Sequence, residues 1–254
     1  MTSSATEGAA VSETAGPYSV PEMISRIDES VDRVLRSASG LSERQLGEPS
    51  LLPGWSRGHV LTHIARNADG LRNLLIWAKT GEQTPQYASV EAREQDIETG
   101  SSRNGEELTA DIASSGLAFT ELAAELPDDA WQASVQMIRG EVIPASSVLS
   151  LRLFELEVHH VDLGAGYRAA DWPDWFVSDE LYRVSGRLAH DPDAPSAVLN
   201  DPQTGRQYFV RADGSSALAI TGPGYDLLAW LLGRSGGNEL STEPAGPLPA
   251  VPAY

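Results

Sequence analysis

Two short segments, far apart in the chain, contain four of the five histidines and could together bind a metal ion. His59 and His63 lie in the first segment, and His159 and His160 lie in the second. Glu155 precedes His159 by four residues, so on a helix both side chains project from one face. His59 and His63 have the same spacing, which alone does not say which of them binds. His63 lies one turn deeper in its helix, whereas His59 lies near the N-terminus and could instead cap the helix or support the ligands. Three ligands, His63, Glu155 and His159, would leave coordination positions open for chemistry.

Two alternatives compete with this assignment. Glu157 is the other nearby carboxylate, but it lies only two residues from His159 and points to another side of a helix. Glu155 and His159 could also form an exposed ion pair worth only a few tenths of a kcal/mol. Against that alternative, leucines surround the pair, and a buried carboxylate without a cation or donor is costly. The leucines are Leu149, Leu153, Leu156 and Leu163. We expect His160 and Asp162 to support the ligands or to lie at the surface.

The donor set narrows the choice of metal. Two imidazoles and one carboxylate suit zinc, and they can also hold nickel, cobalt, manganese or iron(II). We expect zinc, because a Lewis acid without redox chemistry is sufficient for the reaction considered below. The chain contains no cysteine, which excludes disulfides, thiolate ligands and a protein thiol nucleophile. Any sulfur chemistry must therefore come from a bound small molecule.

Composition excludes several classes of partner. The formal net charge is −18, which repels nucleic acid and anionic membrane surfaces. An anionic substrate would therefore need arginines close to the metal. The longest apolar run, 227–232, is too short to cross a bilayer, which takes about twenty residues. The first residues do not have the pattern of a secretion signal, so we expect a cytoplasmic protein, and we expect a monomer.

Hydrophobic spacing predicts four long helices and places the candidate ligands on two of them. The helices are expected at 20–41, 56–79, 106–126 and from 146 or 147 to 163. Ser56 can cap the second helix, and Gly81 lies beyond its end. A short helix at 89–94 and a hairpin at 131–143, turning at Arg139 and Gly140, complete this part. Inward-facing ligands on long helices are typical of a bundle.

The remaining chain predicts a different architecture, so the expected fold class is α+β. A helix at 176–188, three strand-like runs at 196–199, 207–211 and 217–221, and an apolar helix at 225–232 follow the bundle. The proline-rich end, 241–254, is expected to be a surface-bound or mobile tail. We therefore expect a disordered leader at 1–18, a metal-binding helical bundle at 19–167 and a small α+β domain at 168–254.

Several separated motifs, in order, resemble the actinobacterial mycothiol-dependent maleylpyruvate isomerases, which belong to the wider DinB-like group of metal-binding bundles. The motifs are Gly54-Trp55-Ser56-Arg57-x-His59-x-x-x-His63, Thr80-Gly81-Glu82-x-Thr84-Pro85-x-Tyr87, Glu91-Ala92-Arg93, Pro144-Ala145-Ser146, Arg152-x-x-Glu155-x-x-x-His159-x-Val161-Asp162-Leu163-Gly164 and Gly233-Arg234. The resemblance implies an N-terminal DinB-like four-helix bundle with the metal on His63, Glu155 and His159, followed by a small α/β domain. It also implies that Arg234 and Arg93 bind the substrate, with Arg234 acting in catalysis. Without the resemblance, Arg234 would be interpreted as a cation at a helix C-terminus.

The resemblance implies a metalloenzyme that uses mycothiol as a cofactor and an anionic electrophile as substrate. The metal would lower the pKa of the thiol, and the thiolate would add to maleylpyruvate. Rotation about the resulting single bond and elimination would give fumarylpyruvate. A mycothiol S-transferase, which leaves the thiol attached to another electrophile, is the nearest alternative. A non-catalytic metal- or ligand-binding protein is the second.

Overall fold

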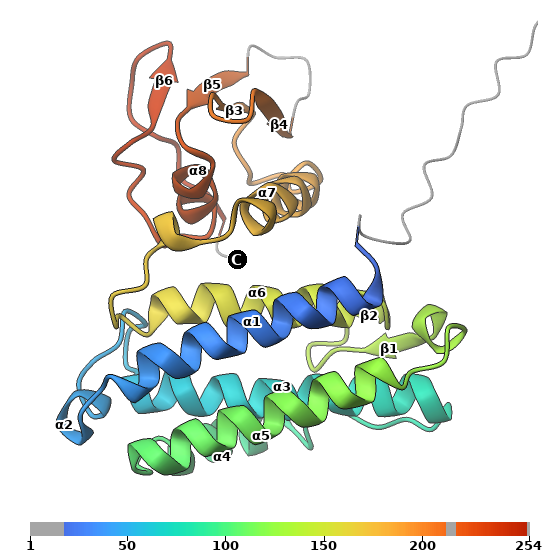
Figure 1. The fold of residues 1–254 in the computed structure, drawn as a ribbon. Coiled ribbons are helices and arrows are strands. Elements are labelled where there is room, and N and C mark those ends of the chain that lie inside the picture. The colour runs from blue at the N-terminus through green and yellow to red at the C-terminus, as the bar shows by residue number, and fades with distance from the viewer. Residues whose placement is uncertain (1–17, 212–216, 253–254) are drawn as a thin grey trace, which may run out of the picture.

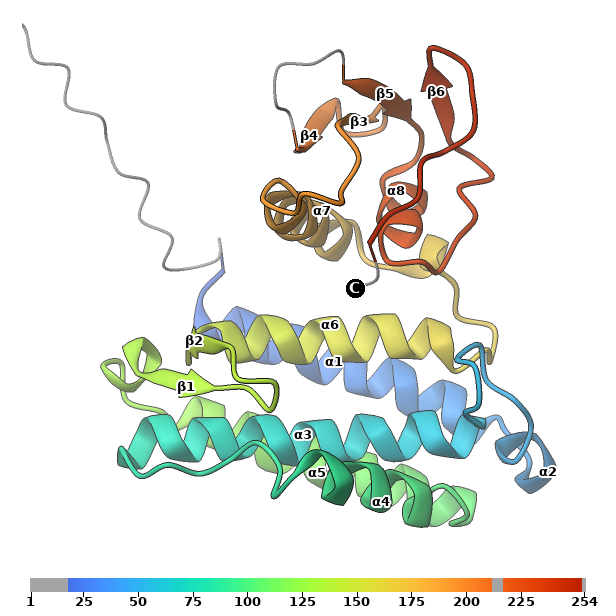
Figure 2. The ribbon, with the colours of Figure 1, turned by 180° about the vertical axis from the view of Figure 1, so that it is seen from behind.

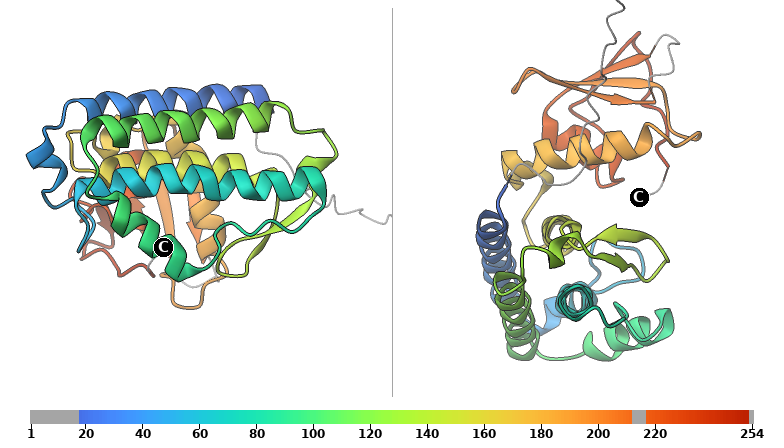
Figure 3. Two further views of the ribbon diagram at one scale, coloured as in Figure 1. Left: turned by 90° about the horizontal axis from the view of Figure 1, so that it is seen from below. Right: turned by 90° about the vertical axis from the view of Figure 1, so that its right-hand side faces the viewer.

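In the computed structural model, which describes residues 18–211 and 217–252, four long helices pack side by side (Figure 1). They are α1 (Val20–Ser39), α3 (Arg57–Thr80), α5 (Gly105–Ala124) and α6 (Ser147–Asp162). Two shorter helices, α2 (Glu43–Leu46) and α4 (Val90–Gly100), lie in the connections on either side of α3. The end-on view in the right panel of Figure 3 shows α1 beside α5 and α6 above α3. This arrangement is the predicted bundle.

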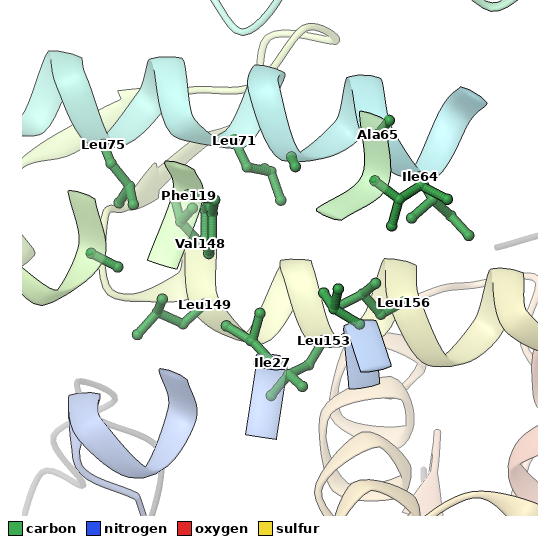
Figure 4. Close-up of a cluster of buried hydrophobic side chains, with 14 of the residues drawn as sticks. Ile27, Ile64, Ala65, Leu71, Leu75, Phe119, Val148, Leu149, Leu153 and Leu156 are labelled. Atoms are coloured by element: carbon green, nitrogen blue, oxygen red, sulfur yellow. The ribbon is translucent and has the colours of Figure 1, made fainter. Parts of the chain in front are cut away.

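The bundle core is formed by the apolar faces of these helices (Figure 4). Ile64, Leu71 and Leu75 project from α3 at steps of seven and four residues, and all three are buried. They meet Phe119 of α5 and a set of buried residues on α6 and α1. That set is Leu149, Leu153, Leu156 and Ile27. Each such side chain stabilises the fold by about 1.5–3 kcal/mol when fully buried.

Local signals in the sequence set the ends of α3. The Ser56 side chain accepts a hydrogen bond from the backbone N–H of His59, and Gly81 follows the helix with φ of 74°. Glycine adopts that left-handed conformation without steric cost. Both ends agree with the prediction. The next helix, α4, is longer than predicted, and the predicted hairpin is present as β1 (Ser134–Gln136) paired antiparallel with β2 (Val142–Pro144).

The C-terminal part places two helices against one four-stranded sheet (Figure 2). The helices are α7 (Asp174–Leu188) and α8 (Gly224–Leu231). The strands are β3 (Ala197–Asp201), β4 (Arg206–Val210), β5 (Leu218–Thr221) and β6 (Ser241–Glu243), in the order β4-β3-β5-β6. β3 and β5 run parallel, and the other pairs are antiparallel. The fold class is α+β, as predicted.

The helix that carries Glu155 and His159 contributes to both hydrophobic cores. Leu149, Leu153 and Leu156 of α6 face the bundle, whereas Phe154, Val158 and Val161 pack into a second core with residues of α7, α8 and the sheet. Because apolar residues cover two sides of α6, the helix lies between the two parts, as Figures 1 and 2 show. The helix that carries two of the candidate ligands therefore packs against both parts of the protein.

One strand was not anticipated from the sequence. The predicted tail begins with β6, which pairs antiparallel with β5 and forms one edge of the sheet. The three predicted strand runs correspond to β3, β4 and β5. Of the leader predicted at 1–18, residues 1–17 lie outside the described residues, as do the last two residues of the tail. Among the helices that the structure describes, none is long and apolar enough to cross a membrane.

Candidate metal centre

Three side chains from two helices meet at one point. Nε2 of His63 on α3 lies 2.9 Å from Oε2 of Glu155 on α6, and Nε2 of His159 lies 3.3 Å from the same oxygen. One donor atom from each of these residues lies within 4.8 Å of the other two. The two imidazole rings are 4.5 Å apart between centroids and nearly perpendicular. The structure thus brings together the three residues selected from the sequence in a cluster that could hold a metal ion.

Burial and hydrogen bonding give the three groups different charges. Burial lowers the pKa of His63 to about 4, with the nearby His159 adding to the effect, so His63 is neutral at pH 7. Burial also disfavours charge on His159, but hydrogen bonds to Asp162 and Glu155 outweigh it and raise the pKa to about 9. Burial likewise opposes the Glu155 charge, yet hydrogen bonds from His159 and His63 hold its pKa well below the usual range. The Glu155 side chain is 26% exposed, whereas that of His63 is only 4% exposed, so solvent reaches the cluster on the side of Glu155.

His159 is held in place by a carboxylate from its own helix. Its Nδ1 donates to Oδ2 of Asp162 at 2.9 Å, which leaves Nε2 directed toward Glu155. Such an imidazole–carboxylate pair orients a metal-binding histidine and increases its basicity. Asp162 in turn accepts two hydrogen bonds from Arg234, from Nη2 at 3.0 Å and from Nε at 3.2 Å. Arg234, which follows α8, is therefore linked to the cluster through Asp162, and its side chain is 22% exposed.

The second ring nitrogen of His63, Nδ1, is contacted by a cation. Nη2 of Arg93 on α4 lies 3.2 Å from Nδ1 of His63. A guanidinium can only donate, so Nδ1 accepts and the ring hydrogen is on Nε2, where it bonds to Glu155. Arg93 also lies over the ring of Tyr87, at 5.8 Å from its centroid. Of the two arginines selected from the sequence, Arg93 therefore contacts a histidine of the cluster directly, and Arg234 reaches the cluster through Asp162.

The other candidate residues lie elsewhere. His59 belongs to the N-terminal cap of α3, where its Nδ1 interacts with Ser56 and its Nε2 lies 3.1 Å from Glu98. His160 is buried on another side of α6, hydrogen-bonded to Ser37 and stacked on Tyr167. Glu157 is likewise buried away from the cluster.

The sequence assigned no role to Arg152. In the structure its side chain is fully buried, one turn before Glu155 on α6. Nη1 donates to the carbonyl of Ile64 and to Oδ1 of Asn67, both at 2.8 Å. Nε and Nη2 have no hydrogen-bond partner among the described residues. A buried cation raises the positive potential beneath Glu155 and favours its charged form. The spacing of Arg152 and Glu155 on one helix face was the signal available in the sequence.

Comparisons with known proteins agree with this geometry. A family model described as the mycothiol maleylpyruvate isomerase N-terminal domain matches residues 27–164. The chain belongs to this family. The match begins within α1, covers the rest of the bundle and includes the three clustered residues. No curated protein matches the sequence.

Two solved structures extend the similarity of this maleylpyruvate isomerase family member beyond the bundle. One is the crystal structure of a mycothiol-dependent maleylpyruvate isomerase, with a TM-score of 0.85 and 29% identity. The other is a histidine-to-alanine mutant of a mycothiol-dependent maleylpyruvate isomerase, with a TM-score of 0.84 and 28% identity. Each alignment covers 93% of this chain and 98% of the solved chain. The α+β part is therefore shared, and the chain is a maleylpyruvate isomerase-like enzyme.

Proposed function

We propose that this enzyme uses mycothiol and a divalent metal ion to convert maleylpyruvate into fumarylpyruvate. His63, Glu155 and His159 would hold the metal, and zinc suits their donor atoms. The observation that carries the proposal is the convergence of two imidazoles and a partly exposed carboxylate from two distant segments. The match to an isomerase along almost its full length supports the choice of reaction.

The residues fit a metal ion, which would act as a Lewis acid that ionises the bound thiol and so permits its reversible addition to the substrate double bond. The hydrogen bond to Asp162 stabilises the hydrogen on Nδ1 of His159. Nε2 could then act as a ligand after losing its own hydrogen. If His63 held the metal through Nε2, its ring hydrogen would lie on Nδ1, and Nδ1 would no longer accept from Arg93. The Arg93 guanidinium would then be available to bind a substrate carboxylate.

Arg234 can contact substrate while it remains bound to Asp162. The ion pair with Asp162 uses the hydrogen on Nε of Arg234 and one of the two hydrogens on its Nη2. Nη1 of Arg234 donates one hydrogen to the backbone carbonyl of Leu232 at 2.7 Å. Within the described part of the chain, no partner takes the second hydrogen of Nη1 or of Nη2, and both could bond to an oxygen of the substrate. A cation at this position would stabilise the enolate that develops when the thiol adds. We assign Arg234 this catalytic role and assign carboxylate binding to Arg93 and Arg234.

A turnover assay with the purified, metal-loaded protein tests the proposal. Mycothiol and maleylpyruvate are supplied, and both fumarylpyruvate and free thiol are followed over many turnovers. We expect fumarylpyruvate to accumulate at constant thiol concentration, and we expect chelation of the metal to abolish turnover. Consumption of one thiol per substrate would instead identify an S-transferase. Metal binding without any thiol-dependent reaction would identify a non-catalytic protein.

A further inference from the structure

A pocket of about 210 Å³ lies between the connection from α3 to α4 and the β1–β2 hairpin. Trp77 and Tyr87 contribute aromatic rings to its lining, and Met137 and Ile138 contribute aliphatic groups from the hairpin. Gln83, Gln86 and Gln136 add amides. None of the lining residues is charged, although the chain as a whole has a net charge of −18. The lining of the pocket is therefore neutral in a strongly acidic protein.

The walls of this pocket are held together by specific hydrogen bonds. Oε1 of the buried Gln86 accepts from the backbone N–H of Ile138 at 3.0 Å, which ties the connection to the hairpin. Nδ2 of Asn73 on α3 donates to the carbonyl of Gln86 at 3.3 Å. Val90 at the start of α4 also lines the pocket and is 46% exposed, unlike most large apolar side chains of the protein. A ligand in the pocket would cover it.

Tyr87 connects the pocket to the metal centre. Its ring lies against α3 at Gly70, where an added Cβ would be only 2.7 Å from Cζ of the tyrosine. Arg93 lies over the same ring and also contacts His63. Contacts through Tyr87 and Arg93 therefore link the lining of the pocket to His63, a candidate metal ligand.

We propose that this pocket binds the uncharged, hydroxyl-bearing ring portion of the thiol cofactor, whose sulfur reaches the metal centre past Tyr87. Aromatic faces stack on the apolar faces of sugar-like rings, and amides bond to their hydroxyl groups. The absence of charge in the lining suits a neutral ligand, whereas the arginines at the metal centre suit the anionic substrate. This inference rests on the proposed function, because it assigns a subsite to the same cofactor.

Comparing two thiols on pocket variants tests the inference. Ala88 is exposed and lines the pocket, so Ala88→Trp fills the space without disturbing the core. Ala110→Trp places the same side chain at an exposed position on α5 as a control. In the metal-loaded enzyme we expect Ala88→Trp to raise the KM for mycothiol about tenfold and to leave kcat/KM with N-acetylcysteine, a thiol without rings, unchanged. Val90→Ser should raise the KM for mycothiol less, and Ala110→Trp should change neither parameter.

Two results would overturn the inference: equal effects of Ala88→Trp on both thiols, or no effect on either. Calorimetric titration of the metal-stripped protein with mycothiol measures binding to the pocket independently of turnover. If the proposed function fails but the pocket is correct, mycothiol still binds and Ala88→Trp weakens that binding about tenfold. If only the pocket assignment fails, turnover persists and Ala88→Trp behaves like Ala110→Trp.

Discussion

At the scale of single residues, the two histidines of the cluster differ in charge at neutral pH. His63 is deeply buried and neutral, whereas His159 is charged because Asp162 and Glu155 accept from both of its nitrogens. A metal ion must therefore displace a proton from His159. Asp162 retains its hydrogen bond to Nδ1 in either state and keeps the ring oriented.

Exchange of each histidine of α3 for alanine distinguishes ligand from cap. We expect His63→Ala to lower metal affinity by more than about 100-fold, beyond the loss usual for a supporting residue, and to abolish activity. His59→Ala should retain the metal, because the His59 ring bonds to Ser56 and Glu98 instead. Metal content by elemental mass spectrometry and activity are measured on the same samples. Loss of metal from His59→Ala alone would refute the assignment.

Metal affinity should depend on pH through His159. Its pKa is about 9 in the metal-free protein, so below that pH a proton competes with the metal for Nε2. We expect affinity to fall about tenfold for each unit of pH below about 9 and to level off above it. His63, with a pKa of about 4, should add nothing between pH 6 and 9. Competition titrations with a chromophoric chelator measure this dependence, and a flat profile would contradict it.

At the scale of elements, α3 is positioned by a close approach to the end of α4. Gly58 lies in the first turn of α3, and a Cβ added there would be 2.1 Å from the backbone carbonyl oxygen of Ser101. Gly100 similarly lies against Thr62. These contacts bring α4 close enough to α3 for Arg93 to reach His63. Here glycine is required for packing, not for an unusual backbone conformation.

Two glycine-to-alanine variants test the role of this approach. Alanine is favoured over glycine in a helix by about 1 kcal/mol, so Gly186→Ala in α7, which has no atom within 4 Å of the added Cβ, should be neutral or stabilising. We expect Gly58→Ala to destabilise the fold by about 1–3 kcal/mol, because the helix must move away from a backbone atom. Urea denaturation gives both values. Equal stabilisation by the two variants would show that the α3–α4 contact is not tight.

At the scale of the whole molecule, a buried polar network joins the bundle to the connection that leads into the C-terminal part. Glu157 of α6 is 1% exposed and accepts from Ser30 and Arg33 of α1, both at 2.5 Å. It also accepts at 2.6 Å from Tyr167, which lies in the connection after α6. The indole N–H of Trp172 donates to the Glu157 carbonyl at 3.0 Å. These bonds hold α1, α6 and the connection together on the side of α6 away from the metal centre.

Removing the cation from this network should be costly. We expect Arg33→Met to lower the free energy of unfolding by about 3–5 kcal/mol, because Glu157 stays buried without its counter-charge. Arg44→Met breaks an exposed ion pair with Glu48 and should cost no more than about 1 kcal/mol. Chemical denaturation at pH 7 compares the two variants. Similar values would mean that Ser30 and Tyr167 are sufficient to stabilise Glu157.

The sequence by itself determined the local features. The four-residue spacing of Glu155 and His159 put both on one face of α6, and Ser56 and Gly81 marked the ends of α3. The lack of cysteine meant that any sulfur chemistry must come from a bound small molecule. Such signals act between neighbours along the chain, so periodicity and capping chemistry are enough to recognise them.

Only the tertiary structure decided which distant segments meet. The pairing of Asp162 with Arg234, the contact of Arg93 with His63 and the addition of β6 to the sheet all join residues far apart in the sequence. The burial of Arg152 and the pocket beside Tyr87 have the same origin. Each depends on how all the helices and strands pack at once, because burial and partner choice are properties of the assembled core and not of any local pattern.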